Sequence, residues 1–189
     1  MEGFFFLKKY IKDPKRVGAV LPSSKNLAYK MVEDIDFENS VCIVEYGPGT
    51  GSFTEELIKR RKAKTLLLLI EHNKEFCQIL KQKYKNQKNF IVINDGAENV
   101  SKYLKIHNIS KVDYIVSGLP FASLPKETSS NILSATKDIL DQHGKFVTFQ
   151  YTLFKKSFIK KWFKRIDIKY VIINVPPAFV FICSNSLHE

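Results

Sequence analysis

The most informative segment of the sequence is Val41-Cys42-Ile43-Val44-Glu45-Tyr46-Gly47-Pro48-Gly49-Thr50-Gly51. Its first five residues form the short, branched apolar run of a buried strand. The glycine-rich loop comes next, and a helical stretch at 52–62 follows it directly. Glycines between a strand and a helix let a ligand approach the backbone where a Cβ would block it. The segment therefore predicts the first β-α unit of a ligand-binding α/β domain.

The same alternation continues along the chain. Further strands are expected at 65–71, 90–94 and 112–117, separated by helices at 74–85 and 98–107. A helix at 127–142, ended by Gly144 as its C-terminal cap, leads to a fifth strand at 145–151. This order favours βαβ units around a parallel sheet.

The end of the chain has a different pattern. Strand-like runs at 170–175 and 179–183 are separated only by Pro176-Pro177-Ala178. Parallel neighbours need a dozen or more connecting residues, so these two runs must pair antiparallel. We predict one α/β domain over residues 1–189, with N-terminal helices within 1–36. Its Rossmann-like, seven-stranded sheet has parallel strands closed by a C-terminal antiparallel hairpin, and helices on both faces.

Composition limits the class of partner. Thirty Lys and Arg against nineteen Asp and Glu give a formal charge of +11, which favours an anionic partner, either nucleic acid or a membrane with acidic lipids. Cys42, Cys77 and Cys183 show neither a metal-binding spacing nor a disulfide pattern, so they are expected to be buried free thiols in a reducing compartment. No signal peptide or membrane-spanning run is evident. We expect a cytoplasmic protein without a metal site.

Acidic residues end the second and third predicted strands. Glu71 lies twenty positions after Gly51, where a carboxylate accepts hydrogen bonds from ribose hydroxyls. Asp95, followed by Gly96, ends the third strand, where a carboxylate can receive the exocyclic amine of adenine. Both residues lie at the carboxyl ends of parallel strands, which is where such sheets bind ligands. Together with the glycine loop they predict a nucleoside-containing cofactor.

At these residues the sequence resembles the class I S-adenosylmethionine-dependent methyltransferases. The resemblance implies that Glu45 holds the methionine end of the cofactor, that Gly47 and Gly49 give it room, and that Glu71 and Asp95 bind its ribose and adenine. Tyr46 departs from the Leu or Ile usual in small relatives, and its side chain is expected to pack. The remaining predicted cofactor-binding residues are Ser23, Tyr46, Gly51, Gly96 and Ser117.

The fourth strand ends in Ser117-Gly118-Leu119-Pro120-Phe121, which resembles a motif of two subfamilies. Ribosomal RNA adenine dimethylases carry Asn-Leu-Pro-Tyr or Asn-Leu-Pro-Phe there. The resemblance implies that the Asn helps orient the target amine and that the aromatic ring stacks on the base. Here Gly118 occupies the Asn position, which removes the amide, whereas Phe121 could still stack.

The bacterial phospholipid N-methyltransferases are more similar. Their substrate-loop motif resembles residues 117–120 followed by Ser123-Leu124-Pro125, and two other motifs resemble residues 18–24 and 174–180. The chain also ends at Glu189, which leaves no room for the C-terminal helical domain of the RNA dimethylases. The resemblance implies a phospholipid amine as methyl acceptor.

The N-terminal residues fit a lipid substrate. On a helical wheel Phe4, Phe6, Leu7, Tyr10 and Ile11 share one arc, and Lys8, Lys9 and Lys12 lie opposite. This pattern predicts a helix in the membrane interface; the alternative is a helix docked on the core. A basic and aromatic stretch at 154–165 either lines an anionic surface or covers the sheet with solvated lysines.

Methyl transfer to an amine requires mainly that the neutral amine be held in line with the methyl group. The residues expected to do this are Ser117, Gly118, Leu119 and Tyr151, and the candidate proton acceptors are Tyr46, Ser117, Ser23 and Tyr151. We predict an N-methyltransferase acting on phosphatidylethanolamine or a related lipid, bound peripherally to the inner face of the membrane. An RNA N-methyltransferase is the alternative, and a binding module with a vestigial cofactor site is a third reading.

Overall fold

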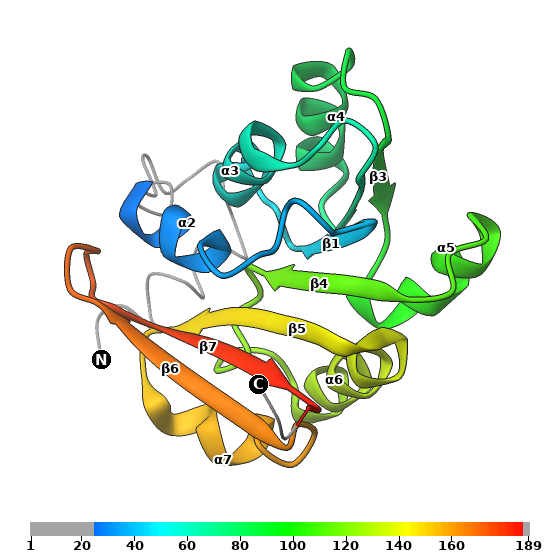
Figure 1. Cartoon of the computed structure of the whole chain (residues 1–189). Coiled ribbons are helices and arrows are strands. Elements are labelled where there is room, and N and C mark those ends of the chain that lie inside the picture. Colours follow the sequence, from blue (N-terminus) through cyan, green and yellow to red (C-terminus); the bar gives the residue numbers. More distant parts are fainter. Residues whose placement is uncertain (1–24, 187–189) are drawn as a thin grey trace.

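The computed structural model describes residues 25–186 (Figure 1). Seven strands form one sheet in the order β3-β2-β1-β4-β5-β7-β6. The first five strands are parallel where they pair, and β7 is antiparallel to both β5 and β6. The predicted seven-stranded sheet with a C-terminal antiparallel hairpin is therefore confirmed. The strands are β1 (Cys42–Tyr46), β2 (Leu66–Glu71), β3 (Phe90–Asn94), β4 (Val112–Ser117), β5 (Leu140–Gln150), β6 (Arg165–Val171) and β7 (Ala178–Ser184).

Helices cover both faces of this sheet, as predicted. Side chains alternate between the faces along each strand, so Ile43 of β1 joins one hydrophobic cluster and Val44 joins the other. The first cluster is covered by α2 (Lys25–Val32), α3 (Ser52–Arg60) and α4 (Lys74–Lys83). The second is covered by α5 (Val100–Ile106), α6 (Lys126–Ile139) and α7 (Lys156–Ile159). Two short 3-10 helices, η1 (Ala97–Asn99) and η2 (Leu153–Lys155), precede α5 and α7.

The strand order reverses between β1 and β4. Tyr46 at the end of β1 is paired in register with Ser117 at the end of β4. The loops that leave these two strands run to α3 and α6, on opposite faces of the sheet. Open α/β sheets bind ligands at the carboxyl edge of such a switch point, and the glycine loop begins there.

The predicted boundary between the long helix and the fifth strand was wrong. Helix α6 ends at Ile139, and Leu140 is already extended and pairs with Val112 of β4. Gly144 lies inside β5 and is not a helix cap. A Cβ at Gly144 would lie 2.9 Å from the Val112 carbonyl oxygen, at a point where the register of β4 and β5 shifts. Gly144 therefore permits close approach of two strands.

The sixth strand was also misplaced. It covers Arg165–Val171, whereas residues 172–177 form the loop to β7. The sequence Arg165-Ile166-Asp167-Ile168-Lys169 has the period-two alternation of a half-buried edge strand. The apolar run at 170–175 had suggested a strand, but most of its side chains are exposed. Part of the basic stretch 154–165 forms η2 and α7.

Other predictions have mixed outcomes. The three cysteines are free and buried, as expected. Between residues 25 and 186, no helix has the length and apolar character needed to cross a bilayer. The predicted interfacial helix at 4–12, the motif at 18–24 and Ser23 lie outside the described residues, so they stay predictions.

Candidate cofactor and substrate site

The glycine loop turns sharply because its three glycines adopt positive φ angles. These are 62° at Gly47, 55° at Gly49 and 92° at Gly51, a region that other residues rarely enter. The Gly47 N–H donates to the Ile70 carbonyl oxygen at 2.9 Å, which ties the loop to β2. The residue preceding α3 is Gly51, and a Cβ there would lie 3.0 Å from Leu80 Cδ2. The backbone of this loop thus lies close to β2 and α4, and no side chain covers it at the three glycines.

Glu45 places a carboxyl group in the core beside this loop. It is fully buried, and its Oε2 accepts a hydrogen bond from Thr54 Oγ1 of α3 at 2.7 Å. Its Oε1 has no hydrogen-bond partner among the described residues. Burial raises the pKa of Glu45 to about 8, and the charge of Glu71 acts in the same direction. A buried carboxyl oxygen without a partner can bind a cationic group of a ligand.

Glu71, at the end of β2, is almost fully buried and binds two backbone amides. Its Oε2 accepts from the Gly49 N–H at 2.9 Å, and its Oε1 accepts from the Asn73 N–H at 2.8 Å. The side chain thereby joins the glycine loop to the start of α4. Each carboxylate oxygen has a second lone pair, so Glu71 can still accept hydrogen bonds from hydroxyl groups.

Asp95 follows β3, and groups from η1 and α5 bind its carboxylate. Its Oδ1 accepts from the Gly96 N–H at 2.7 Å and from Asn99 Nδ2 at 2.9 Å, and its Oδ2 accepts from Tyr103 Oη at 2.6 Å. These hydrogen bonds, that of Tyr103 first, lower the pKa of Asp95. The carboxylate is therefore charged and oriented, and Oδ2 retains a free lone-pair direction for an amine donor.

The glycine loop and the loop after β4 are in direct contact. The Gly118 N–H donates to the Tyr46 carbonyl oxygen at 2.8 Å. A Cβ at Gly118 would lie 2.7 Å from the Gly47 carbonyl oxygen, and a Cβ at Gly47 would lie 2.7 Å from Leu119 Cδ2. The two loops can approach this closely only because both positions are glycine. Gly47 of the predicted cofactor loop is thus brought against Gly118 and Leu119 of the predicted acceptor loop.

Tyr46 and Ser117 turn their side chains away from Glu45, into the face covered by α6. Tyr46 is fully buried, and its hydroxyl is 3.4 Å from Thr136 Oγ1 of α6. Ser117 is also buried, and its Oγ accepts a hydrogen bond from the Leu119 N–H at 3.2 Å. Burial raises the pKa of the Tyr46 hydroxyl well above its ordinary value. Both residues shape the loops through their backbone and core packing.

Tyr151 follows β5 on the same face as Glu45. Its ring contacts Phe149 edge-on at 5.4 Å between centroids, and Phe149 contacts Phe53 of α3 in the same way at 5.8 Å. Burial raises the pKa of Tyr151, while a hydrogen bond with Asn174 lowers it. The phenol is therefore neutral near pH 7 and can donate or accept a hydrogen bond. Among the described candidates for proton transfer, it is the one that is partly exposed.

Three supporting residues were not predicted from the sequence. Thr54 binds Glu45, Tyr103 binds Asp95, and Asn174 binds Tyr151. Each is far from its partner in the chain or lies on another element. Asn174 carried a signal, because it is the one polar residue in the run 170–175 apart from the hydroxyl of Tyr170.

The ring of Phe121 lies in the core and not in the site. Phe121 is fully buried and meets Phe146 of β5 edge-on, with 6.1 Å between ring centroids. The prediction that this ring could stack on a nucleobase is wrong for this structure. The loop after β4 therefore presents neither an amide side chain nor an exposed aromatic ring.

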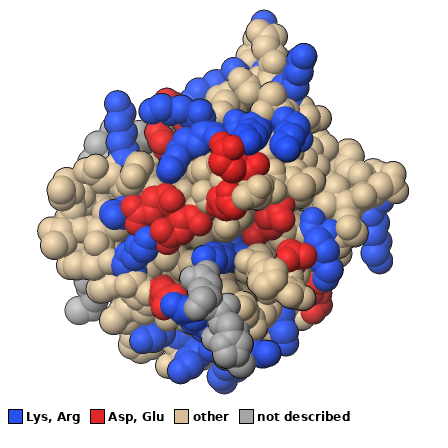
Figure 2. All heavy atoms as spheres, viewed as in Figure 1, with Lys and Arg blue, Asp and Glu red and all other residues tan. Residues whose placement is uncertain are grey.

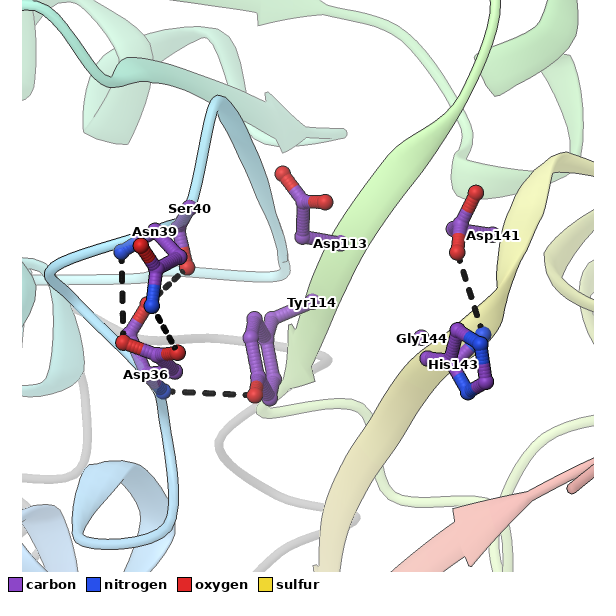
Figure 3. Close-up of a pocket in the computed structure, with 8 residues that line it drawn as sticks. All are labelled: Asp36, Asn39, Ser40, Asp113, Tyr114, Asp141, His143 and Gly144. Carbon is purple, nitrogen blue, oxygen red and sulfur yellow. Dashed lines mark hydrogen bonds between the residues drawn. The ribbon is translucent and has the colours of Figure 1, made fainter.

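A shallow pocket on the opposite edge of the sheet is a separate feature (Figure 3). It lies where β4 and β5 begin. Its polar groups serve the fold: Asp113 Oδ2 accepts from the Val41 and Cys42 N–H groups, and the Asp36 N–H donates to Tyr114 Oη. These contacts fasten the loop before β1 to the sheet, so we place the functional site at the carboxyl edge. The pocket is lined by Asp36, Asn39, Ser40, Asp113, Tyr114, Asp141, His143 and Gly144.

Solved structures share this fold at low sequence identity. A precorrin-6y C5,15-methyltransferase from Geobacter metallireducens has a TM-score of 0.66 at 12% identity, over 85% of this chain and 87% of that one. A putative rRNA methylase from Clostridium thermocellum has a TM-score of 0.62 at 16% identity, over 89% and 99%. Such similarity shows the fold alone.

The fold, together with the family match over residues 14–170, identifies an S-adenosylmethionine-dependent methyltransferase. The chain belongs to the ribosomal RNA adenine dimethylase family, which it matches over residues 14–170. An ornithine lipid N-methyltransferase of Singulisphaera acidiphila is 29% identical over 95% of this chain and 94% of that enzyme. A ribosomal RNA small subunit methyltransferase A of Sulfurihydrogenibium is 31% identical over 89% of this chain and 67% of that enzyme.

Proposed function

We propose that this N-methyltransferase acts on the amine head group of a membrane lipid, phosphatidylethanolamine or a related amino lipid. The observation that carries the proposal is the loop after β4. Gly118 has no side chain and no room for one, and Phe121 is buried against Phe146. An adenine substrate would therefore have no side-chain amide to hydrogen-bond its amine and no aromatic ring to stack on its base. An alkyl amine needs neither.

The relatives support a lipid acceptor. The alignment with the ornithine lipid enzyme includes 94% of that enzyme's length, against 67% for the RNA enzyme from Sulfurihydrogenibium. Amino lipids and adenine bases both present an amine, so the same methyl-transfer mechanism suits either substrate. RNA N-methylation remains the second candidate, because the relatives include RNA methyltransferases and the charge of +11 would also attract phosphates.

In this proposal the carboxyl edge holds the cofactor along three strands. Glu45 Oε1 takes the ammonium of the methionine end, Glu71 takes the ribose hydroxyls, and Asp95 takes the adenine amine. The backbone of the loop can approach the cofactor because Gly47, Gly49 and Gly51 have no side chains. The Gly96 N–H orients Asp95 by a hydrogen bond. When bound, the cofactor supplies a methyl group on a sulfonium, which an amine attacks in line.

The residues of the acceptor side orient that amine. Ser117 fixes the loop backbone, and Gly118 and Leu119 bring it against the glycine loop. Tyr151 accepts a hydrogen bond from the incoming amine through its neutral phenol and holds it on the face of Glu45. An ethanolamine head group is protonated in water, so it must release a proton to the solvent before attack. Partial burial beside the Phe149 and Tyr151 rings favours the neutral amine.

A variant of Asp95 tests the cofactor assignment. Asp95→Ala should weaken S-adenosylmethionine binding roughly 10- to 150-fold, because a hydrogen bond to a charged group is lost. Titration calorimetry measures the affinity. Tyr103→Phe is the matched control, since it removes one partner of the carboxylate but keeps the carboxylate itself. Equal affinities in wild type and Asp95→Ala would refute the assignment.

The acceptor is tested by offering a radiolabelled methyl donor with three substrates in parallel. These are vesicles with phosphatidylethanolamine, vesicles with ornithine lipid, and small-subunit ribosomal RNA. We expect label in one or both lipids and none in the RNA. Label in RNA alone would overturn the proposal in favour of the RNA alternative. Lipid extracts of cells that express the chain should contain methylated amino lipids, identified by mass spectrometry.

A further inference from the structure

In the loop between β6 and β7, a polar side chain is buried and apolar side chains are exposed. Asn174 is buried with 4% of its surface exposed, whereas Ile172, Ile173 and Val175 around it are 70%, 76% and 85% exposed. The Asn174 Nδ2 donates to the Pro176 carbonyl oxygen at 2.7 Å, so the polar side chain holds the loop from inside. We call the exposed set Ile172, Ile173, Val175, Pro176 and Pro177 the apolar tip. Large exposed apolar side chains gathered on one loop mark an interaction surface.

The apolar tip lies at the edge of the sheet that carries the site. Gln150 at the end of β5 is paired with Phe179, and Val171 is paired with Ala178, so the loop extends past the carboxyl ends of the parallel strands. Asn174 also binds Tyr151, which follows β5 directly. Figure 1 shows this hairpin, in orange, projecting beyond the rest of the sheet. One side chain thus shapes the apolar tip and contacts the residue proposed to receive the amine.

The apolar tip carries no charged residue, and basic side chains gather on another part of the same face. In Figure 2 the lobe formed by the hairpin end shows no Lys, Arg, Asp or Glu, while Lys and Arg gather along the lower edge near α7. The exposed basic residues there are Lys156, Lys160, Lys161 and Lys164, and the almost fully exposed Phe154 precedes them. Figure 2 also shows a patch of Asp and Glu beside the lobe, and Glu33 and Asp34 pair with Lys169 of β6. An uncharged apolar tip with a basic surface farther along the same face matches a bilayer with acidic head groups.

We propose that the apolar tip inserts into the head-group and acyl boundary of an anionic bilayer and so sets the site against the lipid amines. This inference rests on the proposed lipid acceptor and names the surface that reaches it. Lipid is favoured over a folded protein partner because the tip is small and projecting, which suits insertion better than a flat interface. It is favoured over RNA because the tip carries no charge for phosphates.

Vesicle flotation with the full chain tests this inference. Ile172→Ser/Ile173→Ser/Val175→Ser should lower partitioning onto phosphatidylglycerol-phosphatidylcholine vesicles by roughly tenfold or more, since three apolar side chains no longer leave water. Val41→Ser/Ile106→Ser is the matched control. These residues are 71% and 60% exposed and lie toward the amino edge of the sheet, so partitioning should hold within about twofold. Added salt should release part of the wild-type protein.

Turnover separates this inference from the proposed function. The triple variant should methylate bilayer lipid more slowly, but it should methylate a monomeric short-chain phosphatidylethanolamine and bind S-adenosylmethionine as the wild type does. If the wild type methylates no lipid, the proposed function is refuted. The flotation result still tests whether the apolar tip binds the membrane. Wild-type flotation by the triple variant would overturn the inference, and a concurrent fall in thermal stability would show that another part of the chain covers the tip. If the triple variant does not fold, Val175→Ser alone should lower partitioning roughly threefold.

Discussion

Glu45→Gln should lower the affinity for S-adenosylmethionine by roughly 10- to 150-fold, the range for losing a charge-assisted hydrogen bond. The amide has the size of the carboxyl and can keep the bond to Thr54, but it cannot become an anion. Glu45 Oε1 has no protein partner within residues 25–186, so the ligand is expected to supply one. Calorimetry at pH 8 measures the change. Thr54→Val is the control: it removes the internal partner of Oε2 and should cost less affinity.

The same variant should be more stable than the wild type when no ligand is bound. Burial raises the pKa of Glu45 from 4.5 to about 8. Between these values the folded protein keeps a proton that the unfolded chain has released, so the free energy of unfolding falls as pH rises through that window. Glutamine has no such titration. We expect the melting temperature of Glu45→Gln to exceed that of the wild type at pH 8 and the difference to shrink toward pH 4.5.

Cofactor binding should also depend on pH in a way that the variant abolishes. A cationic ligand group next to Glu45 favours the carboxylate, so binding releases a proton below about pH 8. Wild-type affinity should therefore rise with pH toward 8, while that of Glu45→Gln stays nearly level. Parallel pH profiles of the two proteins would argue against Glu45 as the ligand-facing carboxyl group.

Gly118→Ala should strongly weaken cofactor binding. Its Cβ would lie 2.7 Å from the Gly47 carbonyl oxygen, which belongs to the backbone and cannot swing aside as a flexible side chain would. The glycine loop must move, and with it the N–H of Gly49 that binds Glu71. We expect a loss of roughly tenfold to hundredfold in affinity, the cost typical of forced overpacking. Gly118→Asn, which restores the residue of the RNA enzymes, should suffer the same loss.

Ser123→Ala is the matched control in the same loop. The Ser123 hydroxyl is buried and has no hydrogen-bond partner within the described residues, so its removal should leave affinity and stability close to those of the wild type. Circular dichroism shows whether Gly118→Ala still folds. A folded Gly118→Ala protein with wild-type affinity would mean that the two loops separate more easily than the contact between them suggests.

Much of the fold followed from local patterns. Branched apolar runs between helical stretches indicated the parallel strands, and β3 and β4 have the predicted bounds. The short link through Pro176 and Pro177 required an antiparallel hairpin. The positions of Gly47, Glu71 and Asp95 at strand ends indicated the edge proposed to hold the cofactor, because parallel strands bring their carboxyl ends together. Gly118 in place of Asn was visible in the sequence and already favoured an alkyl amine.

Contacts between distant segments became visible only in the folded molecule. The sequence could not show that Phe121 is buried against Phe146, because an aromatic residue in a loop pattern fits a core and a binding surface equally well. It placed Gly144 at a helix end, although that glycine lets β4 and β5 approach each other. It suggested a strand at 170–175, whereas Asn174 turns inward to Tyr151 and exposes its apolar neighbours. Local patterns report the backbone that a segment prefers, but the side of the molecule on which each side chain lies depends on which elements pack around it.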